Sequence, residues 1–442
     1  MKYYKNFLWL AIATITLILG CNTSDDDSGG QLRVEITNFQ PSYSQMVLDW
    51  RLSKPDNIII QGISVMRQTS DDFSYPEIID NLPSNSETYT DLDVPYYPEV
   101  SYFLNISFRD ENQPDLGMQT LESELKTFTR NIVLINTVPL QVTRDPINAD
   151  VFHFIDRLDN NLLKKYNATQ NQITAQKSFE NAYSYTNRFF IRNSSLFFVN
   201  SLGVVNQLNT DAYQTEENFQ LNVRDRVNAF SVNADRIYYI DGQVINFLTM
   251  STGESTRLGW GFNPESMIAL NDTEILCTYD GFNWTGATIY NFTPQNCPGT
   301  SFCNPDTLAN SPSISDGNDV DGNILTINNA QTLMVTGRDG NIYNRNDLSK
   351  IASLSAITGE PYFQFAFDAQ NNIYATVQGK KLVHKFKAST FEHIETIETK
   401  LYPLYPLLTA NGLYVLGGYS PVSYWGPYEN FSFNSKCAIE IF

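Results

Sequence analysis

Three histidines occur in the whole sequence, and they are the first residues to weigh for catalysis or metal binding. His153, His384 and His393 lie in segments that we predict to be strands of different repeats, without a Glu-x-x-His or His-x-His spacing. Acid–base pairs and metal sites need such groups at a fixed spacing, so we interpret each histidine as an ordinary strand residue. The Gly-x-Ser-x-Gly elbow of serine hydrolases is also missing. The sequence therefore predicts no catalytic constellation and no histidine metal site.

Acidic residues near the middle of the chain are the nearest approach to a calcium loop. Asp316, Asp319 and Asp321 carry the oxygen atoms that Ca²⁺ prefers. Aligned with an EF-hand, however, the loop has Gly317 in place of the first Asp, and no Glu closes it. An Asp/Asn/Gly-rich turn before a strand at 324–327 is the plainer interpretation, and bound calcium is the alternative.

Aromatic residues beside Gly and Pro are the best indication of binding. Trp260 and Phe262 lie in a Gly-rich segment that we expect to be a loop, and Tyr424, Trp425 and Tyr428 lie in a Pro/Gly-rich insertion. Exposed aromatic rings of this kind suit stacking on sugars or the centre of a protein interface. The alternative is that they cover the end of a domain against its neighbour.

The elements that must position these residues are short strands. Residues 362–398 break into four alternating apolar and polar runs, separated by turn formers such as Gln378-Gly379. A four-stranded sheet of this size needs copies of itself to bury its faces. Copies recur about every 40 residues, with one longer interval, and their second strands are predicted at 151–155, 195–199, 236–240, 274–279, 332–336, 373–377 and 413–417. This spacing predicts an all-β protein with a β-propeller over residues 131–442, of seven blades or alternatively six. Closure by residues 132–136 with 437–442 would remove the exposed sheet edge.

Five cysteines divide into three groups by position. Cys297 and Cys303 lie in the insertion that makes the one long interval, and in an exported protein they predict a disulfide across a surface loop. Cys277 and Cys437 fall in strands of different blades, so we expect two buried thiols that form no disulfide. Cys21 ends an apolar run that follows a positively charged start.

That N-terminal pattern resembles a bacterial lipoprotein signal. Residues 1–20 read as a signal peptide, and Ile18-Leu19-Gly20-Cys21 is similar to the lipobox, which implies a lipid-modified, acylated Cys21 as the first mature residue. Residues 21–30 are too polar to fold and predict a flexible tether. Their acidic cluster, Asp25, Asp26 and Asp27, resembles the surface-export signal of Bacteroidota lipoproteins. The resemblance implies an outer-membrane anchor facing the cell exterior.

Residues 31–130 predict about seven short strands, the number typical of an immunoglobulin-like sandwich. The positions of Trp50 and Tyr102 resemble those of core residues in a fibronectin type III domain, which implies a spacer or an interaction surface.

Two shorter resemblances concern the second half of the chain. Thr307, in Asp306-Thr307-Leu308, resembles an O-glycosylation signal of Bacteroidota exported proteins, and the segment 278–284 resembles the Asp-box turn of sialidase-like propellers, where that turn is structural.

Composition limits the possible functions. The formal net charge is −19, with no cluster of Lys and Arg, which excludes the phosphate neutralisation that nucleic-acid binding requires. We therefore predict a non-catalytic, lipid-anchored surface protein whose propeller binds a partner, as an accessory subunit of an outer-membrane complex for transport, barrel assembly or secretion. The alternative is a cell-surface glycan-binding protein. A propeller glycosidase or lyase ranks last, because paired acids and bases cannot be identified.

Overall fold

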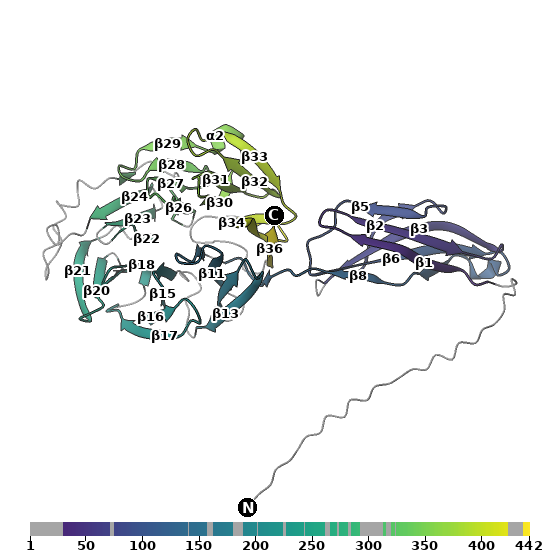
Figure 1. The fold of residues 1–442 in the computed structure, drawn as a ribbon, viewed down its shortest axis with the longest axis horizontal. Coiled ribbons are helices and arrows are strands. Elements are labelled where there is room, and N and C mark those ends of the chain that lie inside the picture. The colour runs from purple at the N-terminus through teal and green to yellow at the C-terminus, as the bar shows by residue number, and fades with distance from the viewer. Residues whose placement is uncertain are drawn as a thin grey trace, which may run out of the picture. The chain divides into compact units, whose positions relative to one another are not determined.

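The computed structural model describes residues 30–442 apart from 71–74, 140, 157–161, 180–188, 201, 224–226, 243, 261–265, 272–273, 282–283, 292–312, 315–319, 323 and 423–435. The regular secondary structure of its described part is almost all β-strand, which confirms the predicted all-β class (Figure 1). Two compact units divide the chain: Met1–Val94 with Glu99–Phe128, and Pro95–Pro98 with Thr129–Phe442. Within the described residues, no helix has the length and hydrophobicity needed to span a membrane.

The first unit consists of two antiparallel sheets. One has the order β1-β2-β5, and the other has the order β4-β3-β6-β7 with β8 paired to β6. The strands are β1 (Arg33–Pro41), β2 (Met46–Ser53), β3 (Ile58–Thr69), β4 (Glu77–Leu82), β5 (Thr88–Asp91), β6 (Glu99–Asp110), β7 (Gln119–Glu122) and β8 (Lys126–Thr129), with a short 3₁₀ turn at Pro114–Leu116.

The core of this unit contains the two landmark aromatic residues. Trp50 in β2 and Tyr102 in β6 are both buried, as predicted. The Tyr102 hydroxyl donates a hydrogen bond to Asp91 Oδ2 (2.7 Å), and Arg67 Nη1 donates to the same oxygen (2.8 Å). Burial of the phenol is therefore compensated by a charged acceptor that is itself paired with a cation.

The second unit is built from consecutive antiparallel sheets of four strands, and its described part contains seven of them. The first three sheets are β10 (Val142–Arg144), β11 (Val151–Asp156), β12 (Leu162–Asn167) and β13 (Gln172–Ser178); β14 (Phe189–Arg192), β15 (Ser195–Val199), β16 (Val204–Asn209) and β17 (Thr215–Gln220); β18 (Val227–Asn233), β19 (Arg236–Asp241), β20 (Val244–Thr249) and β21 (Glu254–Trp260). The fourth and fifth are β22 (Ser266–Ala269), β23 (Glu274–Gly281), β24 (Trp284–Asn291) and β25 (Ser313–Ile314); β26 (Leu325–Ile327), β27 (Leu333–Thr336), β28 (Asn341–Asn344) and β29 (Lys350–Ser353). The short helix α2 (Ser355–Thr358) follows the fifth sheet. The sixth sheet is β30 (Tyr362–Phe367), β31 (Ile373–Val377), β32 (Leu382–Phe386) and β33 (His393–Glu398). The seventh sheet is β34 (Tyr402–Thr409), β35 (Gly412–Gly418), β36 (Cys437–Ile441) and β9 (Leu134–Ile135).

The alternation of side chains explains why the sheets stack. In β31, Ile373, Ala375 and Val377 are fully buried and pack against the fifth sheet, while Tyr374 packs on the opposite face, toward the seventh. Because successive side chains of a strand point to opposite faces, one strand supplies both interfaces. Glycine closes the tight turn that follows, at Gly379 (φ 71°), where a side chain would be strained.

Each neighbouring pair of sheets shares its own hydrophobic cluster, including the last pair. The seventh and first sheets meet in a cluster that contains Phe154 and Tyr166 from one and Leu416 and Ile439 from the other. The five pairs from first–second to fifth–sixth have corresponding clusters, and so does the sixth–seventh pair. The sheets therefore follow one another around a ring, a β-propeller, as Figure 1 shows.

The two ends of the second unit close this ring. Cys437 pairs with Ile135 and Ala438 with Leu134, which joins β36 to β9. The closure predicted from the β-prone segments 132–136 and 437–442 is thus confirmed. All seven second strands predicted from the repeat are also found, as β11, β15, β19, β23, β27, β31 and β35.

Candidate functional site

Most residues that the sequence singled out lie outside the described part of the chain. Cys21, the acidic cluster, both cysteines of the predicted disulfide, Thr307, Asp316, Asp319, Phe262, Tyr424, Trp425 and Tyr428 all belong to this group. Trp260 is the last residue of β21, paired with Val244, so the prediction that it lies in a loop is wrong. Asp321 is described, and its backbone N–H donates to the Thr336 hydroxyl (3.0 Å). Among the described residues, no group of three acidic, His or Cys side chains is arranged to hold a metal ion.

The cysteines and histidines are mostly where the sequence placed them. Cys277 and Cys437 are buried thiols, as predicted, and burial raises the pKa of each. His153, His384 and His393 lie in strands β11, β32 and β33. The expectation that they belong to three different repeats is wrong, because β32 and β33 share the sixth sheet and the rings of His384 and His393 lie 4.6 Å apart.

The clearest candidate for function is a cavity of about 190 Å³ in the second unit. Its wall comes from the first strands of six sheets and from two residues just before such strands. These first strands, among them β22, β26 and β30, lie on the inner side of the ring in Figure 1. The wall is formed by Gln141, Val142, Thr143, Phe190, Ile268, Gly322, Leu325, Thr326, Gln364 and Tyr405.

Polar side chains in this wall are held by specific hydrogen bonds. The amide nitrogen of Gln141 donates to Thr143 Oγ1 (2.8 Å) and to the Phe189 carbonyl (2.9 Å). Its amide oxygen accepts from the Phe189 backbone N–H (3.1 Å). The Thr326 hydroxyl donates to the carbonyl of Phe365 in the next sheet (3.0 Å). The bonds between Gln141 and Phe189 and between Thr326 and Phe365 cross between sheets, so they fix the wall without adding any charge to it.

Threonine recurs in the second half of the second strand of three successive sheets, at Thr278 in β23, Thr336 in β27 and Thr376 in β31. All three side chains are buried. The Thr376 hydroxyl accepts from the backbone N–H of Gln364 (2.9 Å) and lies 3.0 Å from the carbonyl of Leu404, to which it donates. It therefore links the inner strands of the sixth and seventh sheets. This repeated Thr was a signal in the sequence that could have located the inner rim.

Gly322 explains how one side of the wall packs so closely. A Cβ at this position would lie 2.2 Å from Thr278 Oγ1 and 2.4 Å from Ser266 Oγ, and those two hydroxyls are 2.6 Å apart in a hydrogen bond. Only glycine lets the backbone approach a wall at this distance. The glycine of the acidic segment thus has a packing reason of its own.

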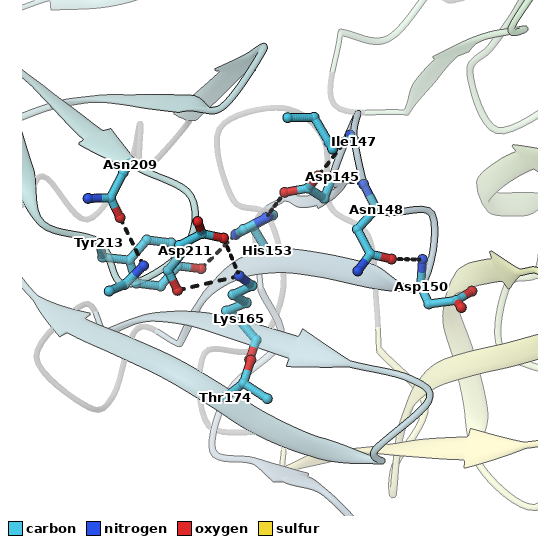
Figure 2. Close-up of polar contacts among 11 residues, drawn as sticks. Asp145, Ile147, Asn148, Asp150, His153, Lys165, Thr174, Asn209, Asp211 and Tyr213 are labelled. Atoms are coloured by element: carbon cyan, nitrogen blue, oxygen red, sulfur yellow. Dashed lines mark hydrogen bonds and ion pairs between the residues drawn. The ribbon is translucent and has the colours of Figure 1, made fainter.

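A second polar cluster lies in the first two sheets, where Asp145, His153 and Tyr213 form a chain of hydrogen bonds (Figure 2). His153 Nε2 lies 3.0 Å from Asp145 Oδ2, and His153 Nδ1 lies 2.7 Å from the Tyr213 hydroxyl. An ionised carboxylate only accepts hydrogen bonds, so Nε2 carries the imidazole proton and Nδ1 accepts from Tyr213. The cluster joins β11 of the first sheet to the turn between β16 and β17 of the second.

Burial determines the protonation of this cluster. It lowers the pKa of His153, and the neighbouring Asp145 opposes that effect only in part. Burial acts to raise the pKa of Asp145, but backbone N–H groups of Asn148 and Ile147, together with His153, lower it on balance. Burial also raises the pKa of Tyr213 well above its ordinary value.

The same burial favours a structural role for the cluster over a catalytic one. Asp145, His153 and Tyr213 are respectively 6%, 0% and 1% exposed. A general base must come within hydrogen-bond reach of the substrate proton, and these side chains are covered on all sides. The chain of hydrogen bonds therefore satisfies buried polar groups and fixes two sheets to each other.

Comparison with known proteins adds little on function. No protein-family model and no curated protein matches the sequence. Among solved structures, the structure of U3-55K is similar with a TM-score of 0.48 and 10% identity, covering 70% of this chain and 98% of that one. The crystal structure of the RRP9 WD40 repeats is similar with a TM-score of 0.47 and 9% identity, covering 70% and 97%.

Proposed function

We propose that this protein is a non-catalytic, lipid-anchored cell-surface protein whose β-propeller serves as a binding platform. The observation that carries the proposal is the inner cavity, whose wall combines fixed amide and hydroxyl groups with aromatic and aliphatic side chains. Such a wall is typical of binding sites. Its ten described residues include neither the paired carboxylates of a glycosidase nor another acid–base pair, and this supports binding over hydrolysis at this site.

The finer architecture is part of the same proposal. Each four-stranded sheet is one blade, which makes a seven-bladed propeller, and the separate cluster at each sheet interface supports this count over six. The first unit is a fibronectin type III-like spacer, and its division into sheets of three and five strands supports that assignment. The signal sequence, Cys21 and the acidic tether support an anchor on the outer face of the outer membrane. An outer-membrane protein complex is the partner that such an anchored platform would serve.

The anchor and the partner are tested on intact cells. Wild-type protein should fractionate with the outer membrane, incorporate labelled palmitate, and be cut by protease added outside the cells. Cys21→Ser should abolish the label and release the protein from the membrane. Mass spectrometry of gently solubilised, affinity-purified protein should then identify a co-purifying barrel protein. Secretion of the wild-type protein with Cys21 unmodified would refute the anchor, and a lone monomer after purification would refute the complex.

Glycan binding is the second candidate function, and the composition of the cavity wall favours it. Amides, hydroxyls and aromatic rings are the groups that recognise sugars. A lipid anchor and a spacer would present such a site to polysaccharides outside the cell. Binding of the purified protein on a glycan array would support this function, and no binding to any immobilised glycan would count against it.

A further inference from the structure

The size of the inner cavity limits what can enter it. At about 190 Å³, it is slightly larger than the engineered cavity of about 150 Å³ that holds one benzene molecule. Drug-sized ligands occupy pockets of about 300–1,000 Å³. The cavity therefore has room for one six-membered ring with small substituents.

Charge limits the ligand further. None of the ten residues in the described wall carries a formal charge. An ionised phosphate, carboxylate or ammonium group would lose its hydration without gaining a counter-charge, which is unfavourable. The ligand that fits this wall is neutral.

Two hydroxyls in the wall have hydrogen-bonding capacity left for a ligand. Thr143 Oγ1 accepts from Gln141 Nε2, and no described residue accepts the proton of the Thr143 hydroxyl. The Thr326 hydroxyl gives its proton to the Phe365 carbonyl, so its oxygen can still accept. One fixed donor and one fixed acceptor match hydroxyl groups, each of which both donates and accepts.

Aromatic rings supply the apolar part of the wall. Tyr405 is held by a hydrogen bond from its hydroxyl to the Pro139 carbonyl (3.0 Å), and its ring packs edge-on against Phe363. Phe190 packs edge-on against Phe230 with ring centroids 4.9 Å apart. Rings fixed in this way cost little conformational entropy when a ligand arrives.

We propose that the inner cavity binds one neutral pyranose ring. This inference rests on the proposed function of the propeller as a binding platform, and it names the ligand class of that platform. The ring is either a free monosaccharide or the terminal residue of a glycan, since both present the same chemistry to the wall.

The test uses the purified full-length lipoprotein in detergent, with isothermal titration calorimetry. The probes are glucose, galactose, mannose and N-acetylglucosamine, each also as its methyl glycoside and as the end residue of an oligosaccharide. Glucuronic acid and adenosine serve as charged and heteroaromatic controls. Binding of at least one neutral sugar is expected, with no binding of either control. Preference for the oligosaccharide would indicate a glycan end, and equal binding of the free sugar would indicate a monosaccharide.

Variants place the ligand in the cavity. Thr143→Val removes the donor at constant shape, and one lost hydrogen bond should weaken binding about 2- to 10-fold. Leu325→Phe narrows the cavity and should weaken binding more strongly. Thr396→Val, on the exposed outer strand β33, is the matched control and should bind as wild type. Thermal melting of each variant checks that it folds.

Several results would overturn the inference. These are binding of glucuronic acid or adenosine in place of neutral sugars, no binding of any sugar, or sugar binding that both cavity variants leave unchanged. If the sugar-binding inference fails but a barrel protein still co-purifies, the proposed function as an anchored platform is retained. Conversely, cavity-dependent sugar binding by a protein whose Cys21 is unmodified would keep the inference and refute the anchor.

Discussion

Acidification should destabilise the propeller through His153. This imidazole is fully buried between Asp145 and Tyr213, and burial lowers its pKa from the ordinary 6.5. A group whose pKa is lower in the folded state favours folding above its unfolded pKa, and that contribution is lost as the pH falls. The folded chain keeps the imidazole neutral while the unfolded chain takes up a proton below about pH 6.5.

The magnitude follows from this difference in proton uptake. With a folded imidazole that stays neutral, the penalty is RT ln(1 + 10^(6.5 − pH)), which is about 0.06 kcal/mol at pH 7.5 and about 1.4 kcal/mol at pH 5.5. The free energy of unfolding should therefore fall by at most about 1.4 kcal/mol across this range because of His153. Asp145 also has a lowered pKa, but its contribution is lost only near and below about pH 4.

The assay is urea denaturation of the full chain at pH 7.5, 6.5 and 5.5, followed by circular dichroism. Wild type and His153→Gln are compared with His393→Gln, whose histidine is exposed on β33. His384, whose pKa is also lowered by burial and by His393, remains in all three proteins. His153→Gln should lose the fall in unfolding free energy that acidification causes through residue 153. His393→Gln should keep nearly all of that fall. An equal fall in stability for wild type and His153→Gln would refute the reasoning.

Three further predictions concern what holds the ring together. Lys164→Met should cost about 3–5 kcal/mol of unfolding free energy, because it leaves the fully buried Asp156 carboxylate without its cation. Lys380→Met, at an exposed ion pair, should cost less than about 1 kcal/mol. Urea denaturation measures both costs, and equal costs would contradict the prediction. Thr376→Val should cost about 1–3 kcal/mol, because it leaves a buried backbone N–H of β30 unsatisfied, and Thr376→Ser should restore most of it in the same assay. Deletion of residues 437–442 removes β36 from the closing sheet and should make the propeller sensitive to limited proteolysis; wild-type resistance would show that closure does not depend on this strand.

The repeat could be predicted because its information is local. Second strands such as β15 and β31 are short, largely apolar β-prone runs between turn formers, and the predicted bounds of these two strands match the structure to the residue. Closure was predictable for a related reason, since both ends of the second unit carry β-prone residues left over from the repeat. Trp260 was misplaced because the glycines on each side resemble a loop, whereas β21 accommodates the segment with a bulge opposite Ile245 and Asn246.

The cavity could not be predicted because nothing local marks it. Its wall takes one to three residues from each of several segments that are far apart in the chain, and strands such as β10 and β26 have only three residues. Three residues are too few for a period to be read. Thr143 and Thr326 therefore look like ordinary strand residues, and only the closing of the ring brings them to one cavity.

Stability and binding are assigned in part to different residues in this propeller. The clusters between sheets bury the apolar side chains that hold the ring. Of the wall residues, Tyr405 is a buried member of one cluster, and Val142, Phe190, Ile268 and Leu325 pack against clusters. Gln141, Thr143, Thr326 and Gln364 belong to none of these clusters, so exchanging them alters hydrogen bonding at the cavity without opening a hydrophobic interface. The polar wall residues can therefore be exchanged while the repeat that forms the ring is kept. For this reason the repeat in the sequence predicts the fold but not the ligand.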